Sequence, residues 1–388
     1  MLIKIQIGST TNKGDELMLL ALSERLGQAN RLLVEPQKVD ERLVESLGMY
    51  RQLRTSALLW AKRLLRKPVS TLAWSAKQLA QRSSFHEMRF ALVKAADAYI
   101  DASGYAYGDP WGSEPVEMAA RLAAEFKRRN RPVIMMPQTF GPFKNERVRN
   151  SFLRLVEHVD LLFARDRFSY ENVTSLTGPS SNIRIAPDYT SPVNGSLPSE
   201  KGMFNGRYAC IIPSHRMLDS VPSEVANRYL YFLSNCVRQL SRMNIRPIIV
   251  LHDVRYDVDV AHSLKDAVDE QLTIIDEKDA KIVRGIIGKS YLVISSRFHG
   301  LINALIQGVP CLATEWTHKF YALMDAYGCG DFLVSPMDAE DVLARKLELL
   351  DDDGTRKQLI ERIRISARKQ HADTLKMWAS IEKVLKTV

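Results

Sequence analysis

The chain has 388 residues, a length that suggests two domains of ordinary size or one large domain. Hydrophobic residues make up 46% of it and charged residues 26%, and this globular composition excludes a disordered or fibrous protein. The formal net charge is +9. Residues 51–90 carry nine cations and one acid, and nine minus one gives +8, nearly the whole excess. The rest of the chain is therefore close to neutral, which argues against a general nucleic-acid-binding surface.

Apolar, β-branched runs alternate with longer helical patterns through the first half of the chain. The expected strands are Leu2–Gly8, Arg31–Val34, Ala98–Ala102, Pro132–Met136, Leu161–Ala164 and Ile183–Ala186. Helical patterns lie between them, with apolar positions three or four residues apart, as in Asp15–Leu26, Glu114–Arg128 and Glu146–Glu157. A segment rich in Pro, Gly and Ser, Pro187–Gly206, then interrupts the alternation and predicts an interdomain linker.

The same alternation restarts in the second half. Its expected strands are Tyr208–Ile212, Pro247–Leu251, Leu272–Ile275, Tyr291–Ser295, Val309–Ala313 and Phe332–Val334. Repeated strand–helix units predict an α/β fold with two doubly wound, Rossmann-like domains that face a cleft, at 1–195 and 207–388. The first domain carries a basic helical excursion at about 51–90, and a helical stretch from Gly354 to Lys386 is long enough to reach back across the domain junction.

The chain shows no signal for export and no framework of cysteines. It contains no run of about 18 apolar residues, and its first eight residues read as a strand rather than as a leader, so we expect neither secretion nor membrane spanning. The four cysteines lie in the second half without C-x-x-C spacing. They predict buried thiols in a reducing cytoplasm.

The loop after the first strand, Gly8–Glu16, is small and polar and opens a helix. Ligands of open parallel sheets bind beyond the carboxyl ends of the strands, and a helix N-terminus can bind a phosphate or a carboxylate. Spacing alone favours a plain turn, in which Asp15 and Glu16 stabilise the helix dipole. The loop is neither a Walker loop nor a G-x-G-x-x-G fingerprint.

The stretch Ile294–Leu305 is the second candidate, because polar residues and a glycine interrupt an apolar strand and an apolar helix. Arg297 offers a bidentate fork for a carboxylate or phosphate, and His299 at a helix N-terminus can exchange a proton near neutral pH. The pair suits an anionic substrate that needs acid–base help. The alternative is a surface arginine in an ion pair beside a capping histidine.

Three further candidates carry weaker signals. Lys319 follows the next strand, where it either reaches the same cleft or lies in a solvated loop. Arg165 follows a strand of the first half, and the alternative to a binding role is a local salt bridge with Asp166. Asp257–Asp259 has the D-x-D form of metal-dependent sugar-nucleotide enzymes, but its helical, acidic surroundings favour a solvated helix face. No histidine spacing fits a metal site, so none is predicted.

Taken together, segments of this chain resemble the polysaccharide pyruvyl transferase family. They are the N-x-G-D-E turn at Asn12–Glu16, Pro137–Pro142, Arg165–Asp166, and Ser296–Gly300 followed by Gly308–Pro310. The resemblance runs from about Ile3 to Gly328, and the Arg-x-His-Gly helix entry with Gly-Val-Pro is its specific part. Thr11 stands where the family commonly has Gly, which alters the backbone path near the donor, and Phe298 replaces the usual Leu and is expected to pack inward.

The resemblance implies a GT-B-type fold and an enzyme that moves the enolpyruvyl unit of phosphoenolpyruvate onto two hydroxyls of a sugar. Phosphate is released and a cyclic pyruvate ketal remains, with no metal and no cofactor beside the donor substrate. The implied catalytic residues are Arg297 and His299, and the implied donor-binding residues are Arg165, Lys319, Asn12, Gly14 and Asp15. Arg165 and Lys319 would hold the phosphate and carboxylate, and His299 would protonate the enol carbon or take a hydroxyl proton.

The implied acceptor is a sugar of a surface or exported polysaccharide, or its lipid-linked precursor. Residues 51–90 combine their cations with leucines, Trp60 and Trp74. This composition is typical of an amphipathic helix that binds an anionic membrane leaflet. It fits equally a basic helix that packs on the core or on another subunit. We therefore expect a cytoplasmic protein, free or peripheral on the inner face of the membrane, without a nucleic-acid partner and with its oligomeric state open. The alternatives are a GT-B glycosyltransferase that uses a nucleotide sugar and a catalytically idle scaffold.

Overall fold

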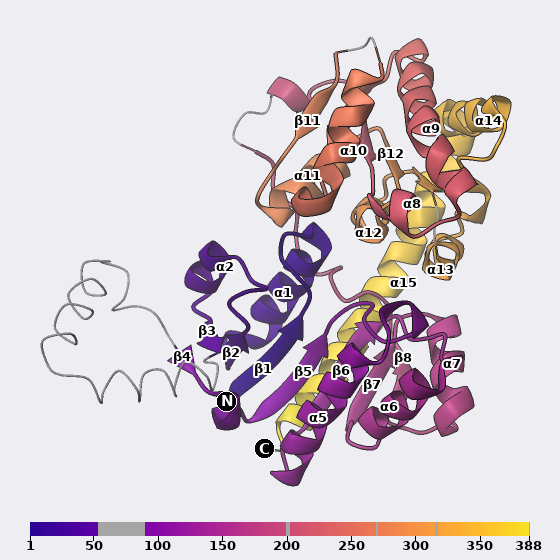
Figure 1. Cartoon of the computed structure of the whole chain (residues 1–388). Coiled ribbons are helices and arrows are strands. Elements are labelled where there is room, and N and C mark those ends of the chain that lie inside the picture. Colours follow the sequence, from indigo (N-terminus) through magenta and orange to yellow (C-terminus); the bar gives the residue numbers. More distant parts are fainter. Residues whose placement is uncertain (53–89, 199–201, 269–270, 315–316, 388) are drawn as a thin grey trace, which may run out of the picture.

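The computed structural model describes residues 1–52, 90–198, 202–268, 271–314 and 317–387, which form two α/β domains joined by the segment between the two sheets and by a long helix (Figure 1). Within these residues the first sheet has the order β4-β3-β2-β1-β5-β6-β7-β8 and the second the order β11-β10-β9-β12-β13-β14. Neighbouring strands are parallel throughout. The expected pair of doubly wound, Rossmann-like domains is confirmed.

The strands of the first sheet are β1 (Leu2–Ile7), β2 (Arg31–Val34), β3 (Tyr50–Gln52), β4 (Phe90–Ala91), β5 (Ala98–Ala102), β6 (Val133–Gln138), β7 (Leu161–Ala164) and β8 (Ile183–Ile185). Those of the second are β9 (Tyr208–Ile212), β10 (Arg246–Val250), β11 (Thr273–Ile275), β12 (Leu292–Ser295), β13 (Cys311–Thr314) and β14 (Leu333–Val334). Every expected strand forms within two residues of its expected bounds. The last two strands at one end of the first sheet, β3 and β4, were not expected, because strands this short carry no readable periodicity.

Helices cover both faces of the first sheet. They are α1 (Lys13–Leu26), α2 (Glu41–Ser46), α5 (Glu114–Arg128), α6 (Glu146–Val156) and α7 (Arg167–Thr177). Alternate side chains of β1 point to opposite faces, so Ile3, Ile5 and Ile7 pack with α1 in one core. Helices α5 and α6 pack on the opposite face around Tyr99 and Phe126.

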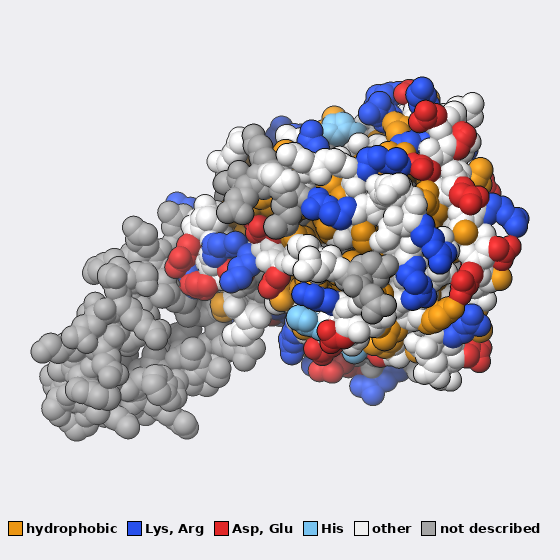
Figure 2. All heavy atoms as spheres, turned by 90° about the horizontal axis from the view of Figure 1, so that it is seen from above, with side chains coloured by type: hydrophobic (Ala, Val, Ile, Leu, Met, Phe, Trp, Pro, Cys, Tyr) orange, Lys and Arg blue, Asp and Glu red, His pale blue; other side chains and the backbone are white. Residues whose placement is uncertain are grey.

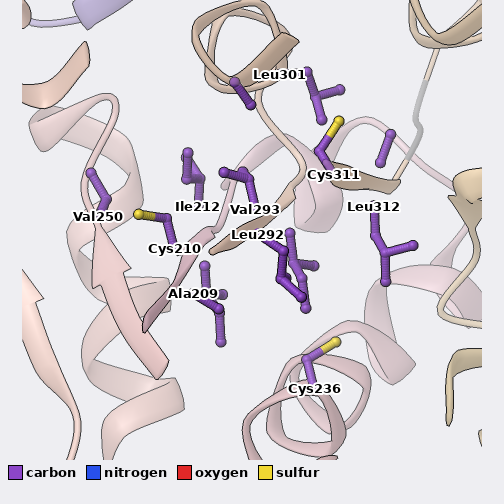
Figure 3. Packing of buried hydrophobic residues seen from close by; sticks show 14 of the residues in the cluster. Ala209, Cys210, Ile212, Cys236, Val250, Leu292, Val293, Leu301, Cys311 and Leu312 are labelled. Carbon is purple, nitrogen blue, oxygen red and sulfur yellow. The ribbon is translucent and has the colours of Figure 1, made fainter. Parts of the chain in front are cut away.

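The second domain has a single continuous core. Its helices are α8 (Arg216–Asp219), α9 (Ser223–Arg242), α10 (Val254–Asp266), α11 (Ala280–Lys289), α12 (Phe298–Leu305), α13 (His318–Ala326) and α14 (Glu340–Asp351). Figure 3 shows Cys210, Cys236 and Cys311 among aliphatic side chains of this core. All four cysteines are buried and unbridged, and burial raises the pKa of Cys210 to about 12, so these thiols are packing groups rather than nucleophiles.

The helix α15 (Asp353–Leu385) contributes to both domains. Its first half packs on the second domain through Leu359 and Ile363, and its last turns enter the first-domain core through Met377, Trp378 and Ile381. Figure 1 shows this helix, in yellow, crossing from one domain to the other. The division at 1–195 and 207–388 stays a prediction, and α15 shows that the first core is completed by residues from the far end of the second range.

The basic stretch expected at 51–90 lies outside the described residues from 53 to 89. At its start, Arg51 in β3 is buried and pairs with Glu41 of α2. In the part of the chain that the structure describes, no helix combines the length and the apolar character needed to cross a membrane. Cations and acids are interspersed over the face shown in Figure 2, without a field of one sign among the described residues.

Candidate active site

The loops that follow β1 and β10 meet between the two domains. Asn12 forms an isolated antiparallel bridge with Asp253, and the Lys13 backbone N–H donates to the carbonyl of His252 over 2.8 Å. The Asn12 side chain also caps α1 by accepting from the Gly14 N–H at 2.9 Å. Both loops lie at the carboxyl ends of their strands. Their backbone contacts hold the N-terminus of α1 against the second domain.

His299 lies in the first turn of α12 and faces this junction. Its Nε2 is 3.1 Å from Oδ2 of Asp188, which follows β8 in the first domain. Gly14 packs directly against the imidazole ring, since a Cβ at this position would lie 2.2 Å from Nδ1. His299 thus contacts the first domain on two sides.

Asp188 is held in place by a buried hydrogen-bond network. The Thr190 hydroxyl and N–H donate to its Oδ1 over 2.6 and 3.0 Å, and Arg284 donates to the Thr190 hydroxyl over 3.0 Å. Arg284 also donates from Nε to Asn303 of α12 over 2.8 Å, so the network returns to the helix that carries His299. The start of the expected linker is therefore a buried part of the site rather than a plain connection.

Burial and charge act in opposite directions on the pKa values of Asp188 and His299. Burial alone would raise the pKa of Asp188, but His299, Arg165 and Thr190 lower it below its ordinary value, and the carboxylate stays ionised. Burial lowers the pKa of His299 against the opposing effect of Asp188. An ionised Asp188 accepts from the Nε2–H group, so a neutral imidazole has its lone pair on Nδ1.

Replacing Asp188 by Asn is expected to lower kcat by about 10²- to 10⁴-fold, because the imidazole loses the acceptor that sets its tautomer and its charge partner. Turnover and thermal unfolding should be measured together. Asp341→Asn, on the exposed surface of α14, serves as the control for the same chemical change. Full turnover of the Asp188 variant would contradict the positioning role.

Arg165 and Lys319 both lie against the Phe298 ring. The Arg165 guanidinium carbon is 4.1 Å from the ring centroid and the Lys319 ammonium 5.5 Å. Arg165 donates to Thr139 over 2.6 Å and lies 3.9 Å from Asp188. Phe298 is buried, as expected for the residue that departs from the family pattern.

Both cations are buried, and this affects their protonation. Burial lowers the pKa of Lys319 well below its ordinary value, and the neighbouring Arg165 and Arg297 lower it further. Burial also lowers the pKa of Arg165. The alternative salt bridge with Asp166 does not form, since Asp166 instead caps α7 by accepting from the Ser169 N–H at 2.7 Å. Two buried cations of this kind favour binding of an anion.

Arg297 is engaged by carboxylates of the second domain. Its Nε donates to Asp257 over 2.8 Å, its Nη2 donates to the same carboxylate, and its Nη1 lies 3.8 Å from Asp253. Asp257 is fully buried in α10 and also accepts from the His215 and Asp253 backbone N–H groups. The expectation of a solvated helix face was wrong for Asp257 and holds for the exposed Asp259.

Asp15 is a partly buried carboxyl group beside this ion pair. Its Oδ2 packs against the backbone of Gly8, where a Cβ would lie 2.2 Å away. Burial and the neighbouring Asp253 raise the pKa of Asp15 to about 7, against the opposing effects of Arg297, Lys38 and Lys319. Asp15 is thus poised to hold or release a proton near neutral pH.

The structure brings the residues expected from the sequence to one junction. They are Asn12, Gly14, Asp15, Arg165, Arg297, His299 and Lys319. Sequence reasoning missed Asp188, His252, Asp253 and Asp257 as members of the site. Asp188 follows β8, and His252 and Asp253 follow β10, so the rule on strand ends would have found three of these four.

A pocket of about 670 Å³ adjoins the site between the domains. Arg165, Asp188, Phe298 and Lys319 line it together with residues of α15. Within the described residues, no group of three or more His, Cys, Asp or Glu side chains is arranged to hold a metal ion.

Comparisons with solved structures identify the fold. The chain is similar to Staphylococcus aureus MnaA in a co-structure with UDP, with a TM-score of 0.61, 12% identity and coverage of 100% of this chain and 97% of the other. It is similar to Neisseria meningitidis UDP-GlcNAc 2-epimerase bound to UDP-GlcNAc, with a TM-score of 0.59, 10% identity and coverage of 99% and 100%. Anabaena Alr3699/HepE in complex with UDP-glucose has a TM-score of 0.59, 12% identity and full coverage of both chains. These likenesses confirm the expected GT-B-type fold.

The comparison with family models identifies the family. No curated protein matches the chain in sequence. The family model for polysaccharide pyruvyl transferase matches residues 12–318, a range that begins at the Asn12 cap and ends beside Lys319. This range covers well over half of the chain and contains the Asp15, Arg165 and His299 positions. The chain therefore belongs to the polysaccharide pyruvyl transferase family.

Proposed function

We propose that this protein transfers the enolpyruvyl unit of phosphoenolpyruvate onto two hydroxyls of a sugar, releasing phosphate and leaving a cyclic pyruvate ketal. The observation that carries the proposal is the pair of buried cations, Arg165 and Lys319, beside the His299–Asp188 pair. The donor has a phosphate and a carboxylate, and two cations on one aromatic ring match two anionic groups on one small molecule.

Buried cations support an anionic donor on energetic grounds. Their lowered pKa values show that burial disfavours both positive charges, and a bound anion relieves that cost. Arg165 Nε is buried without a hydrogen-bond acceptor among the described residues, so it has a donor group to offer a ligand. In this proposal the chain's own cations neutralise the donor, and no metal or cofactor takes part.

His299 is the general base in this scheme. A neutral imidazole with its Nε2–H group on Asp188 accepts a hydroxyl proton at Nδ1. Asp188 stabilises the imidazolium that forms. In this proposal His299 takes a proton from the acceptor, and another group supplies the proton of the enol carbon.

The acceptor in this proposal is a sugar of a surface or exported polysaccharide or of its lipid-linked precursor. Tyr105 and Trp111 pack edge to face, with ring centroids 5.6 Å apart, and the Lys319 ammonium lies 5.1 Å from the Tyr105 ring. Aromatic rings beside the cations offer apolar faces to a sugar ring. We place the enzyme in the cytoplasm, free or on the inner face of the membrane.

Thermal unfolding with phosphoenolpyruvate tests the donor. A hundredfold excess over the dissociation constant stabilises a protein by about 2.7 kcal/mol, enough for a measurable rise in Tm. We expect this rise with phosphoenolpyruvate, and its loss in Arg165→Ala. A rise with UDP-sugars alone would overturn the proposal and favour the nucleotide-sugar glycosyltransferase. Arg154→Ala, distant on α6, is the control for loss of one positive charge.

A further inference from the structure

The proposed reaction needs two proton carriers, and His299 supplies one. The donor's CH₂ carbon becomes a methyl group, so it gains one proton, while the two acceptor hydroxyls each lose one. A single imidazole held by an ionised Asp188 serves as a base and leaves the enol carbon without an acid. This inference rests on the proposed pyruvyl transfer and asks which side chain supplies that acid.

Asp15 is the acidic group whose geometry fits. It follows Gly14, whose backbone packs against the His299 ring, and it interacts electrostatically with the two donor-site cations, Arg165 and Lys319. Among the described residues its side chain makes no hydrogen bond or ion pair, in contrast to the nearby Asp188, Asp253 and Asp257. It is only partly buried, and therefore accessible to a ligand. A carboxyl without a side-chain partner has its proton available for chemistry.

The charges around Asp15 oppose one another. The charged and titratable groups that interact electrostatically with Asp15 are Asp253, Arg297, Lys38, Lys319, Arg165 and Tyr189. His299 packs against the neighbouring Gly14. The sum of these interactions with burial gives a pKa of about 7, so the carboxyl is about half protonated at neutral pH. A bound donor adds a carboxylate and a phosphate nearby, and this negative charge favours the protonated form further.

We propose that Asp15 is the general acid that protonates C3 of phosphoenolpyruvate, with His299 as the base for the first acceptor hydroxyl. An ionised carboxylate beside an anionic donor would weaken binding, whereas a protonated carboxyl does not. The position therefore suits an acid better than a donor-binding anion.

The proton balance closes with these two groups. First, the Asp15 O–H bond breaks and the C2=C3 π electrons form a C3–H bond, while a hydroxyl oxygen bonds to C2 and its proton passes to His299. Next, the C2–O bond to phosphate breaks with its electron pair on the phosphate, which takes the proton from His299. The second hydroxyl oxygen then bonds to C2 and returns its proton to Asp15. The products are the ketal and hydrogen phosphate, and both side chains regain their starting forms.

Asp15→Asn tests the proposal, because it keeps the shape and removes the acid. We expect kcat to fall by about 10²- to 10⁴-fold while the Tm rise with phosphoenolpyruvate is kept. Asp259→Asn on the exposed face of α10 is the matched control and should keep wild-type turnover. Turnover of Asp15→Asn within fivefold of wild type, or loss of donor binding together with turnover, would overturn the acid role.

A second variant tests the role through the pH profile of kcat. An acid must be protonated to act, so activity should fall as pH rises through the pKa of Asp15, giving an alkaline limb near pH 7. Asp253→Asn removes a charge that raises this pKa, so the limb should move to lower pH. An unmoved limb would contradict the assignment. If wild-type protein itself neither binds nor turns over phosphoenolpyruvate, the proposed function fails, and that result differs from a failure confined to Asp15.

Discussion

Arg297→Ala is expected to destabilise the protein by about 3–5 kcal/mol. The substitution leaves Asp257, whose side chain is fully buried, without its bidentate partner, and an uncompensated buried carboxylate is costly. Denaturant unfolding monitored by circular dichroism measures the change in the free energy of unfolding.

An exposed arginine provides the control for this change. Arg345 pairs with Asp341 on the surface of α14, and Arg345→Ala should change the free energy of unfolding by less than about 1 kcal/mol. Adding Asp257→Asn to Arg297→Ala should recover part of the loss, because the buried charge is then removed. An Arg297→Ala protein of wild-type stability that no longer binds the donor would show instead that this side chain acts on the donor, as the family resemblance implies.

Gly14→Ala is expected to lower kcat by about 10²- to 10³-fold. The new methyl group would lie 2.2 Å from Nδ1 and 2.4 Å from Cγ of His299, so the imidazole must leave the position in which Nε2 meets Asp188. In a helix Ala is ordinarily more favourable than Gly by about 1 kcal/mol, so a loss of activity here reflects the close approach and not helix propensity. Steady-state kinetics and Tm should be measured on the same preparation.

Gly354→Ala is a closely matched control. Gly354 holds the same position in the first turn of α15 and donates to its cap Asp352 as Gly14 donates to Asn12. A Cβ at Gly354 meets only Asp352, at 3.5 Å, so wild-type turnover is expected. Equal kcat for Gly14→Ala and wild type would mean that the ring tolerates displacement and that its position against Gly14 does not matter for turnover.

The sequence predicted the strands well because buried parallel strands are continuous apolar runs. Strand ends then located Asn12, Arg165, His299 and Lys319, since parallel topology brings the carboxyl ends of different strands together. The partners of these side chains were not readable. Asp188 lies in a segment whose Pro and Ser content resembles a linker, although tertiary packing buries it.

The role of Arg297 was the clearest difference. Its partner Asp257 is 40 residues away in the chain and lies on a helix whose acidic sequence resembles a solvated face. Charge pairing between distant segments depends on how helices dock on a sheet, which a single sequence does not reveal. Thus local patterns located the site, and tertiary contacts decided which of its side chains are free to meet a substrate.

The path of α15 bears on how the protein is made. The core beneath α1 includes Met377, Trp378 and Ile381, and the fully buried Trp378 ring packs edge to face against Tyr189. During synthesis the first sheet therefore emerges from the ribosome long before the residues that finish covering it. Domains generally fold in the order of synthesis. Here the apolar core of the first domain stays partly exposed until the end of α15 has been translated. We therefore expect the two domains of the protein to complete folding together. Nascent chains halted before residue 377 should require chaperones to remain soluble.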